Sequence, residues 1–150
     1  MKATVFIATS VDGFIARLDG SIDWLTSGTS DAEKNEDYGY QELMNTVDTL
    51  VMGRNTYETV AGFDQWPYGE KRVIVLTSRS IDIPSSISST VESLSAPPAE
   101  IIPILQERGT KHPYIDGGKT IQSFLAEGLI QQLIITKIPV LIGTGIPLFG

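Results

Sequence analysis

Short apolar runs, each closed by a turn-forming residue, recur along this 150-residue chain. They are rich in strand-forming side chains and predict strands at 5–8, 49–52, 72–77, 113–116 and 133–136. Between them, apolar residues return at helical spacing and predict helices at 40–47, from 55 onward, at 97–109 and at 119–127. Strands that are apolar throughout are typical of a sheet covered on both faces. The pattern predicts a single α/β domain over residues 1–150, with three layers and a mixed, mostly parallel sheet flanked by helices.

Two segments of the chain deviate from this simple alternation. Residues 78–95 hold eight serines, which indicates a surface loop plus one edge strand at 90–92 rather than a linker between domains. The helix at 97–109 is expected to hold Pro103 in its first turn and to end at Gly109.

Charge and composition exclude several function classes. Asp and Glu number 18 against 11 Lys and Arg, a net charge of −7, so no nucleic-acid partner is expected. The chain has no Cys and one His, His112, which argues against a metal site; His112 itself is expected to face solvent. No signal pattern follows Met1, and no apolar run approaches the roughly 20 residues that span a bilayer. We expect a cytoplasmic protein without a membrane partner.

The segment Gly117-Gly118-Lys119-Thr120 lies between a predicted strand and a predicted helix. Two glycines let the backbone approach a ligand, and the helix start offers N–H groups to an anion. The segment is no P-loop, because Pro113 stands where that motif needs its first glycine, and Leu148 breaks a dinucleotide-binding pattern at Gly143. A phosphate site is the functional interpretation, and a tight turn without a ligand is the alternative.

Two further strand ends carry groups that suit phosphates. Gly53-Arg54-Asn55-Thr56 repeats the glycine turn and adds an arginine, while Thr77-Ser78-Arg79 adds hydroxyls and a second arginine. Each segment alone is more typical of a solvated turn. Together at successive strand ends they favour one dinucleotide.

With these motifs, the chain resembles the dihydrofolate reductase-like superfamily, and more closely the reductase domain of bacterial riboflavin biosynthesis, the C-terminal domain of the bifunctional deaminase-reductase. The matching segments are 8–16, 48–58, 73–79, 115–120 and 142–150. The resemblance implies an NADPH-dependent oxidoreductase. It places Ala8 and Ile15 beside the nicotinamide and assigns the phosphates to Gly53, Arg54 and Thr56 and to Gly117, Gly118, Lys119 and Thr120. The adenosine ribose and its 2′-phosphate are assigned to Thr77, Ser78 and Arg79.

The resemblance also suggests groups for the substrate. Asp37 lies at the distance of the carboxylate that holds the pterin in folate-reducing relatives, with Glu36 and Tyr38 as rivals and a plain helix-start carboxylate as the alternative. Asp12 is either a turn-former or a catalytic group beside the substrate. Trp24 either packs on the substrate cleft or anchors its loop.

The implied reaction is hydride transfer to a C=N bond or ribosyl imine of a pyrimidine or pterin-like small molecule, as in 5-amino-6-(5-phosphoribosylamino)uracil reductase. The rivals are a dihydrofolate reductase and a dinucleotide-binding protein without catalysis. Relatives continue past 146–150 with two more antiparallel strands, which are absent here. An apolar strand at 133–136 near an open sheet edge therefore predicts a homodimer.

Overall fold

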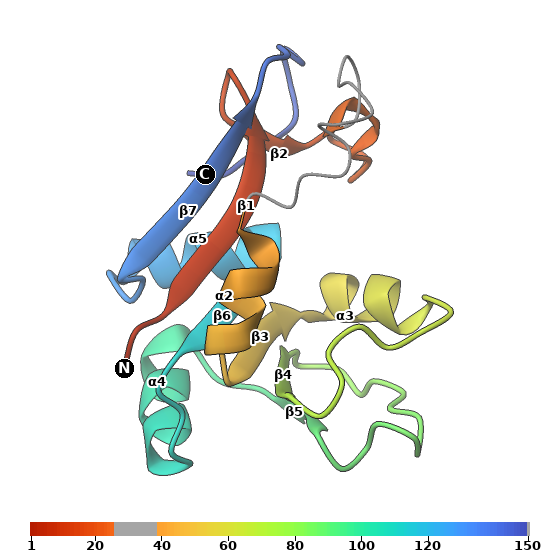
Figure 1. The fold of residues 1–150 in the computed structure, drawn as a ribbon, viewed down its shortest axis with the longest axis vertical. Coiled ribbons are helices and arrows are strands. Elements are labelled where there is room, and N and C mark those ends of the chain that lie inside the picture. Colours follow the sequence, from red (N-terminus) through yellow and green to blue (C-terminus); the bar gives the residue numbers. More distant parts are fainter. Residues whose placement is uncertain (26–38, 150) are drawn as a thin grey trace.

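The computed structural model describes residues 1–25 and 39–149. Strands and helices alternate along most of this part of the chain (Figure 1). The strands are β1 (Thr4–Ser10), β2 (Phe14–Ala16), β3 (Thr49–Gly53), β4 (Arg72–Leu76), β5 (Val91–Leu94), β6 (Pro113–Asp116), β7 (Gln132–Ile138) and β8 (Ile146–Pro147). The helices are η1 (Asp23–Leu25), α2 (Tyr40–Thr46), α3 (Arg54–Ala61), α4 (Pro98–Glu107) and α5 (Gly118–Ala126).

The main sheet has six strands in the order β5-β4-β3-β6-β1-β7, and every pair within it is parallel. The carboxyl ends of β3 and β6 are adjacent, because Met52 pairs with Asp116. A separate antiparallel pair joins β2 to β8. The predicted mostly parallel α/β sheet is confirmed, and ligands of such sheets bind outside the carboxyl ends of the strands.

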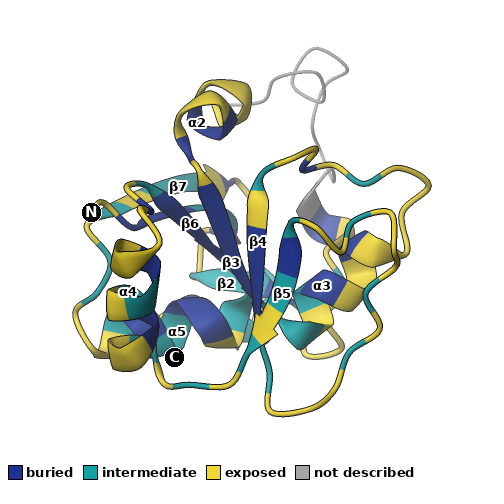
Figure 2. Ribbon diagram, turned by 90° about the horizontal axis from the view of Figure 1, so that it is seen from below, coloured by how far each residue is buried: buried dark blue, intermediate teal, exposed yellow. Residues whose placement is uncertain are grey.

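Apolar side chains alternate to opposite faces of the sheet and form two cores. On one face Leu50 and Met52 pack with Tyr57 of α3 and Leu43 of α2. On the other face, Val51 packs with residues of α4 and α5 such as Ile101, Ile121 and Phe124. Figure 2 shows β3 and β4 buried along most of their length. The helices thus cover both faces of the sheet and form three layers with it. The carboxyl ends of the strands are the place where a ligand site is expected.

Three local expectations need correction. Pro103 lies in the second turn of α4, because the helix begins at Pro98, where a missing N–H costs nothing. His112 is half-buried rather than exposed, since its Nε2 lies 2.8 Å from Thr4 Oγ1 at the start of β1. The β2–β8 pair was not predicted, because strands of 3 and 2 residues carry too little pattern.

Candidate functional site

Two helices begin side by side at the carboxyl ends of β3 and β6. Gly53 is the N-cap of α3 and Gly117 is the N-cap of α5, and neither cap supplies a side-chain hydrogen bond. The first N–H groups of a helix have no partner within the helix. Both helix starts therefore retain N–H donors, and anion binding by them stays a prediction.

The two helix starts are in direct contact. A Cβ on Gly117 would lie 2.8 Å from Thr56 Oγ1, and a Cβ on Gly53 would lie 2.9 Å from Thr120 Oγ1. Gly117 also has φ +95°, a conformation that side chains of L residues rarely adopt. Glycine is thus required at Gly117, while a side chain at Gly53 would force the Thr120 hydroxyl to shift, and each threonine hydroxyl lies against the opposite turn.

Ile15 packs against the start of α5, on one side of the two helix starts. Its Cδ1 lies 2.9 Å from where a Cβ of Gly118 would stand, and Ile146 is also near. Ala8 is half-buried near the end of β1, where it pairs with Thr136. The structure therefore brings Ile15 together with the α5 start, while Ala8 lies two strands away from β3 in the same sheet.

A hollow of about 470 Å³ joins the end of β4 to the start of α5. Thr77, Ser78, Lys119 and Thr120, four of the predicted residues, line it. Its lining also includes residues that the sequence reasoning missed, Leu76, Ser95, Ala96, Pro97, Pro98 and Ser123. Ser95 follows β5, so the strand-end argument that found the other hydroxyls applies to it equally.

The two predicted arginines differ in their surroundings. Arg54 is half-buried and pairs with Glu58 at 3.4 Å, one helical turn further on. Arg79 is exposed, and its backbone N–H donates to Thr77 Oγ1 in a tight turn. Lys119, rather than Arg79, is the basic side chain that lines the hollow.

Asp116 is a functional candidate that sequence reasoning treated only as part of the turn. It ends β6, and its carboxylate accepts a 2.8 Å hydrogen bond from the Gly117 N–H. Burial raises the pKa of this carboxyl, an effect that the single hydrogen bond only partly offsets. The sequence does carry one signal for Asp116. It lies two residues after the core residue Tyr114 in the same strand, so both side chains are on the same face of the sheet.

Asp12 has a different environment. Its carboxylate accepts hydrogen bonds from Ser10 Oγ and from the N–H groups of Ile142 and Gly143. The bond from Ser10, with smaller contributions from those backbone bonds, lowers the pKa of Asp12. The ionised carboxylate thus ties the β1–β2 turn to the loop after β7, and a catalytic role for it stays a prediction.

Trp24 and Asp37 complete the predicted set. Trp24 is 2 % exposed in η1, and its indole Nε1 has no partner in the described part of the chain. Its contact with substrate stays a prediction. Asp37, with its rivals Glu36 and Tyr38, lies outside the described residues.

The model of the RibD C-terminal domain family matches residues 1–150. The chain belongs to the RibD C-terminal domain family. The chain is similar to the uncharacterised protein YwjB of Bacillus subtilis. The two are 37% identical over 150 residues, which span 99% of this chain and 82% of YwjB. The dihydrofolate reductase HdrB of Haloferax volcanii is 30% identical over 129 residues, or 84% of this chain and 62% of HdrB.

Solved structures agree with this family assignment. A candidate riboflavin biosynthesis protein from Shewanella sp. PV-4 superimposes with a TM-score of 0.88 at 46% identity, covering 100% of this chain and 84% of that one. The deaminase/5-amino-6-(5-phosphoribosylamino)uracil reductase of Thermotoga maritima gives 0.68 at 17% identity, covering 99% and 47%. This second likeness shows the shared fold. No helix in residues 1–25 and 39–149 is long and apolar enough to cross a membrane.

Proposed function

We propose that the chain is an NADPH-dependent reductase that transfers hydride to a C=N bond or ribosyl imine of a pyrimidine or pterin-like substrate. The observation that carries the proposal is the pair of uncapped helix starts in contact at the ends of β3 and β6, beside the buried carboxyl of Asp116. Membership of the RibD C-terminal domain family adds support, because its named structural relatives include a reductase.

The residues at the strand ends fit a dinucleotide. The free N–H groups in the first turns of α3 and α5, which follow Gly53 and Gly117, suit a pyrophosphate, and neither glycine places a Cβ between ligand and backbone. Lys119 and the hydroxyls that line the hollow between β4 and α5 suit the adenosine end with its 2′-phosphate. Ile15, packed on Gly118, would border the nicotinamide. When bound, NADPH would supply the hydride.

Asp116 would hold the proton that accompanies the hydride. A carboxyl whose protonated form is favoured by burial is able to donate a hydrogen bond to a substrate nitrogen and then release its proton to it. Asp37 stays the second candidate for this role. The remaining residues of the site act by positioning cofactor and substrate.

Dihydrofolate reduction is the alternative reaction, favoured by the similarity to HdrB of Haloferax volcanii. A steady-state assay of NADPH oxidation decides between the two. The purified chain is offered dihydrofolate and 5-amino-6-(5-phosphoribosylamino)uracil in parallel, at matched concentrations. Faster turnover of the uracil derivative supports the riboflavin-type reaction, and faster turnover of dihydrofolate supports the alternative. Saturable NADPH binding without oxidation by either would indicate a binding protein.

We also propose that the chain forms a homodimer in the cytoplasm. Strand β7 ends the described main sheet, so one of its edges carries backbone groups without a strand partner among the described residues. Leu133 on this strand is 38% exposed. Such an edge favours pairing with a second chain.

A further inference from the structure

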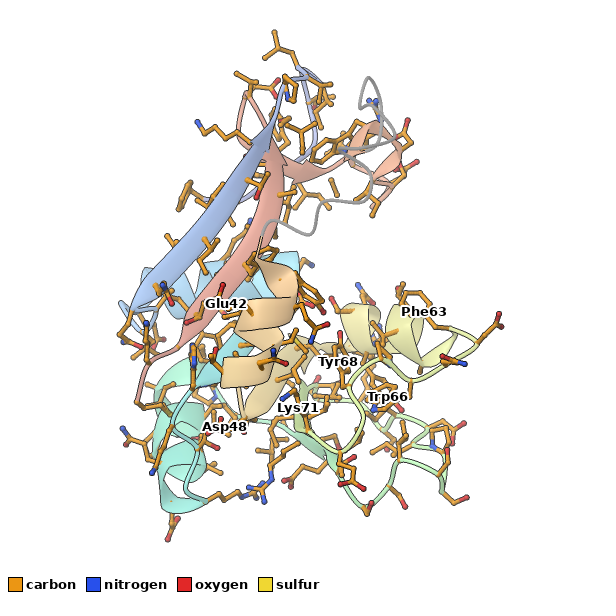
Figure 3. The ribbon with its side chains drawn as sticks, viewed as in Figure 1. Glu42, Asp48, Phe63, Trp66, Tyr68 and Lys71 are labelled. Atoms are coloured by element: carbon orange, nitrogen blue, oxygen red, sulfur yellow. The ribbon has the colours of Figure 1, made fainter. Side chains whose placement is uncertain are left out.

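Asp12 lies in the β1–β2 turn, and its carboxylate reaches the loop that follows β7. It accepts hydrogen bonds from the N–H of Gly143 at 2.9 Å and from the N–H of Ile142 at 3.4 Å, although these donors are 131 and 130 positions further along the chain. Figure 3 shows the side chains of both loops close together, at the end of the sheet away from Asp48. Asp12 thus joins two segments that are distant in sequence.

The buried side chain of Ser10 fixes the orientation of this carboxylate. The Ser10 hydroxyl donates to Asp12 and accepts a 3.0 Å hydrogen bond from the N–H of Phe14. Ser10 is fully buried, so its hydroxyl depends on Asp12 as an acceptor rather than on water. Loss of the carboxylate would leave a buried donor without a partner, which disfavours the present conformation of the turn.

The connection continues from the turn into the short β2–β8 pair. The Leu148 N–H donates to the Gly13 carbonyl at 3.1 Å, and β2 pairs with β8 just beyond it. Each of these two strands places an isoleucine against the start of α5. A Cβ on Gly118 would lie 2.9 Å from Ile15 Cδ1 and 3.6 Å from Ile146 Cγ2. The segments that Asp12 joins are therefore the ones that pack on the α5 start.

We propose that Asp12 is a positioning residue, which holds Ile15 against the start of α5 by joining the β1–β2 turn to the loop after β7. The inference rests on the proposed function, in which Ile15 borders the nicotinamide. It replaces proton donation as the role of this carboxylate. The hydrogen bond from Ser10, with those from the backbone, lowers the pKa of Asp12, and an ionised carboxylate has no proton to give. Displacement of Ile15 would slow hydride transfer, because the rate depends steeply on how the reacting groups are aligned.

Two substitutions of Asp12 distinguish positioning from proton donation. Asp12→Ala should lower kcat for NADPH oxidation about ten- to a hundredfold, the effect of a displacement of about 1 Å, with little change in KM for NADPH. Asp12→Asn should recover most of this loss, because its amide oxygen accepts from the Gly143 N–H and its amide nitrogen donates to the Ser10 hydroxyl oxygen. Asp19→Ala is the matched control and should leave kcat unchanged, since Asp19 accepts from the Ser21 N–H at 2.9 Å within its own turn.

A proton donor would give a different pattern, because an asparagine has no proton to deliver. The same loss of kcat in Asp12→Asn as in Asp12→Ala would therefore overturn the inference. Unchanged kcat in Asp12→Ala would overturn it as well.

An NMR measurement without cofactor separates this inference from the proposed reaction. The Ile15 Cδ1 methyl should show an NOE to the Gly118 α protons in the wild type, weakened in Asp12→Ala and retained in Asp12→Asn and Asp19→Ala. This pattern supports the inference even if NADPH is not oxidised, an outcome that would contradict only the reductase proposal. An NOE of wild-type strength in Asp12→Ala would overturn the inference and leave the reductase proposal intact. If Asp12→Ala does not fold, Ser10→Ala takes its place and should weaken the same NOE, and an unchanged NOE there would also overturn the inference.

Discussion

Gly117 and Thr56 face each other across the two helix starts, so that a Cβ on the glycine would lie 2.8 Å from the threonine Oγ1. The glycine belongs to the turn after β6 and the threonine to the first turn of α3. Because β3 and β6 are adjacent and parallel, the turns that follow them share one edge of the sheet. The contact therefore places the two turns that are predicted to bind anions directly beside each other.

Gly117→Ala should destabilise the fold by about 2 to 4 kcal/mol, from backbone strain together with overpacking against Thr56. Gly128→Ala is the matched control, since Gly128 also has positive φ, +69°, but has open space around it. Chemical denaturation should show a clearly smaller loss for Gly128→Ala. Equal losses would mean that the contact with Thr56 costs nothing.

Arg79→Ala should weaken NADPH binding by about 1 to 3 kcal/mol, the range for a hydrogen bond to a charged group, and should leave NADH binding nearly unchanged. Arg72→Ala is the control, because Arg72 is another exposed arginine and lies at the opposite end of β4. Fluorescence titration with both cofactors measures this. If Lys119→Ala removes the preference for NADPH and Arg79→Ala does not, the 2′-phosphate belongs to the hollow that Lys119 lines.

Asp116→Asn should change how stability depends on pH. Burial raises the pKa of Asp116 in the folded chain, so the folded state binds this proton more tightly than the unfolded state. The resulting stabilisation is complete below the unfolded pKa and is lost as pH rises through the folded pKa. Denaturation at a series of pH values should therefore show a smaller loss of stability for Asp116→Asn between acid and neutral pH. The same slope in both proteins would place Asp116 in a more solvated setting.

Asp116→Asn and Asp37→Asn should distinguish the two candidates for proton supply. The residue that delivers the proton should, when replaced, lower kcat by about a hundredfold or more with cofactor affinity nearly unchanged. Stopped-flow measurement of NADPH oxidation gives both quantities. Unaltered turnover in Asp37→Asn would make Asp37 a helix-start carboxylate, and unaltered turnover in Asp116→Asn would limit that residue to a structural role.

The homodimer is tested by light scattering at micromolar concentration. The wild type should have twice the mass of one 16.3 kDa chain. Leu133→Lys should shift the mass toward that of a monomer, because a lysine on an edge strand opposes pairing. Glu127→Lys, an exposed position at the C-terminal end of α5, should not. A wild-type monomer would contradict the proposed assembly.

Much of the fold was predictable because each long strand carries its own apolar pattern and ends at a turn-forming residue. The pattern at 113–116 matches β6 residue for residue, and the edge strand near 90–92 corresponds to β5. The pairing of β2 with β8 was not predictable in the same way. It depends on tertiary contacts, such as the hydrogen bond from the Leu148 N–H to the Gly13 carbonyl, which no local pattern encodes.

The site was predictable where chemistry follows a strand directly. Gly53 and Gly117 were identified as candidates because a glycine at a strand end lets the backbone turn tightly and approach a ligand. Asp116 was missed because its significance comes from burial, which depends on which chain segments pack together.

The central claim is that the paired helix starts bind NADPH, and a direct titration tests it. NADPH added to the purified chain should give saturable quenching of tryptophan fluorescence, with NADH binding more weakly. Gly117→Ala should weaken NADPH binding at least about tenfold, equivalent to about 1.4 kcal/mol, and Gly128→Ala should not. The account would be contradicted if the wild type showed no saturable NADPH binding, or if Gly117→Ala bound NADPH as tightly as the wild type does.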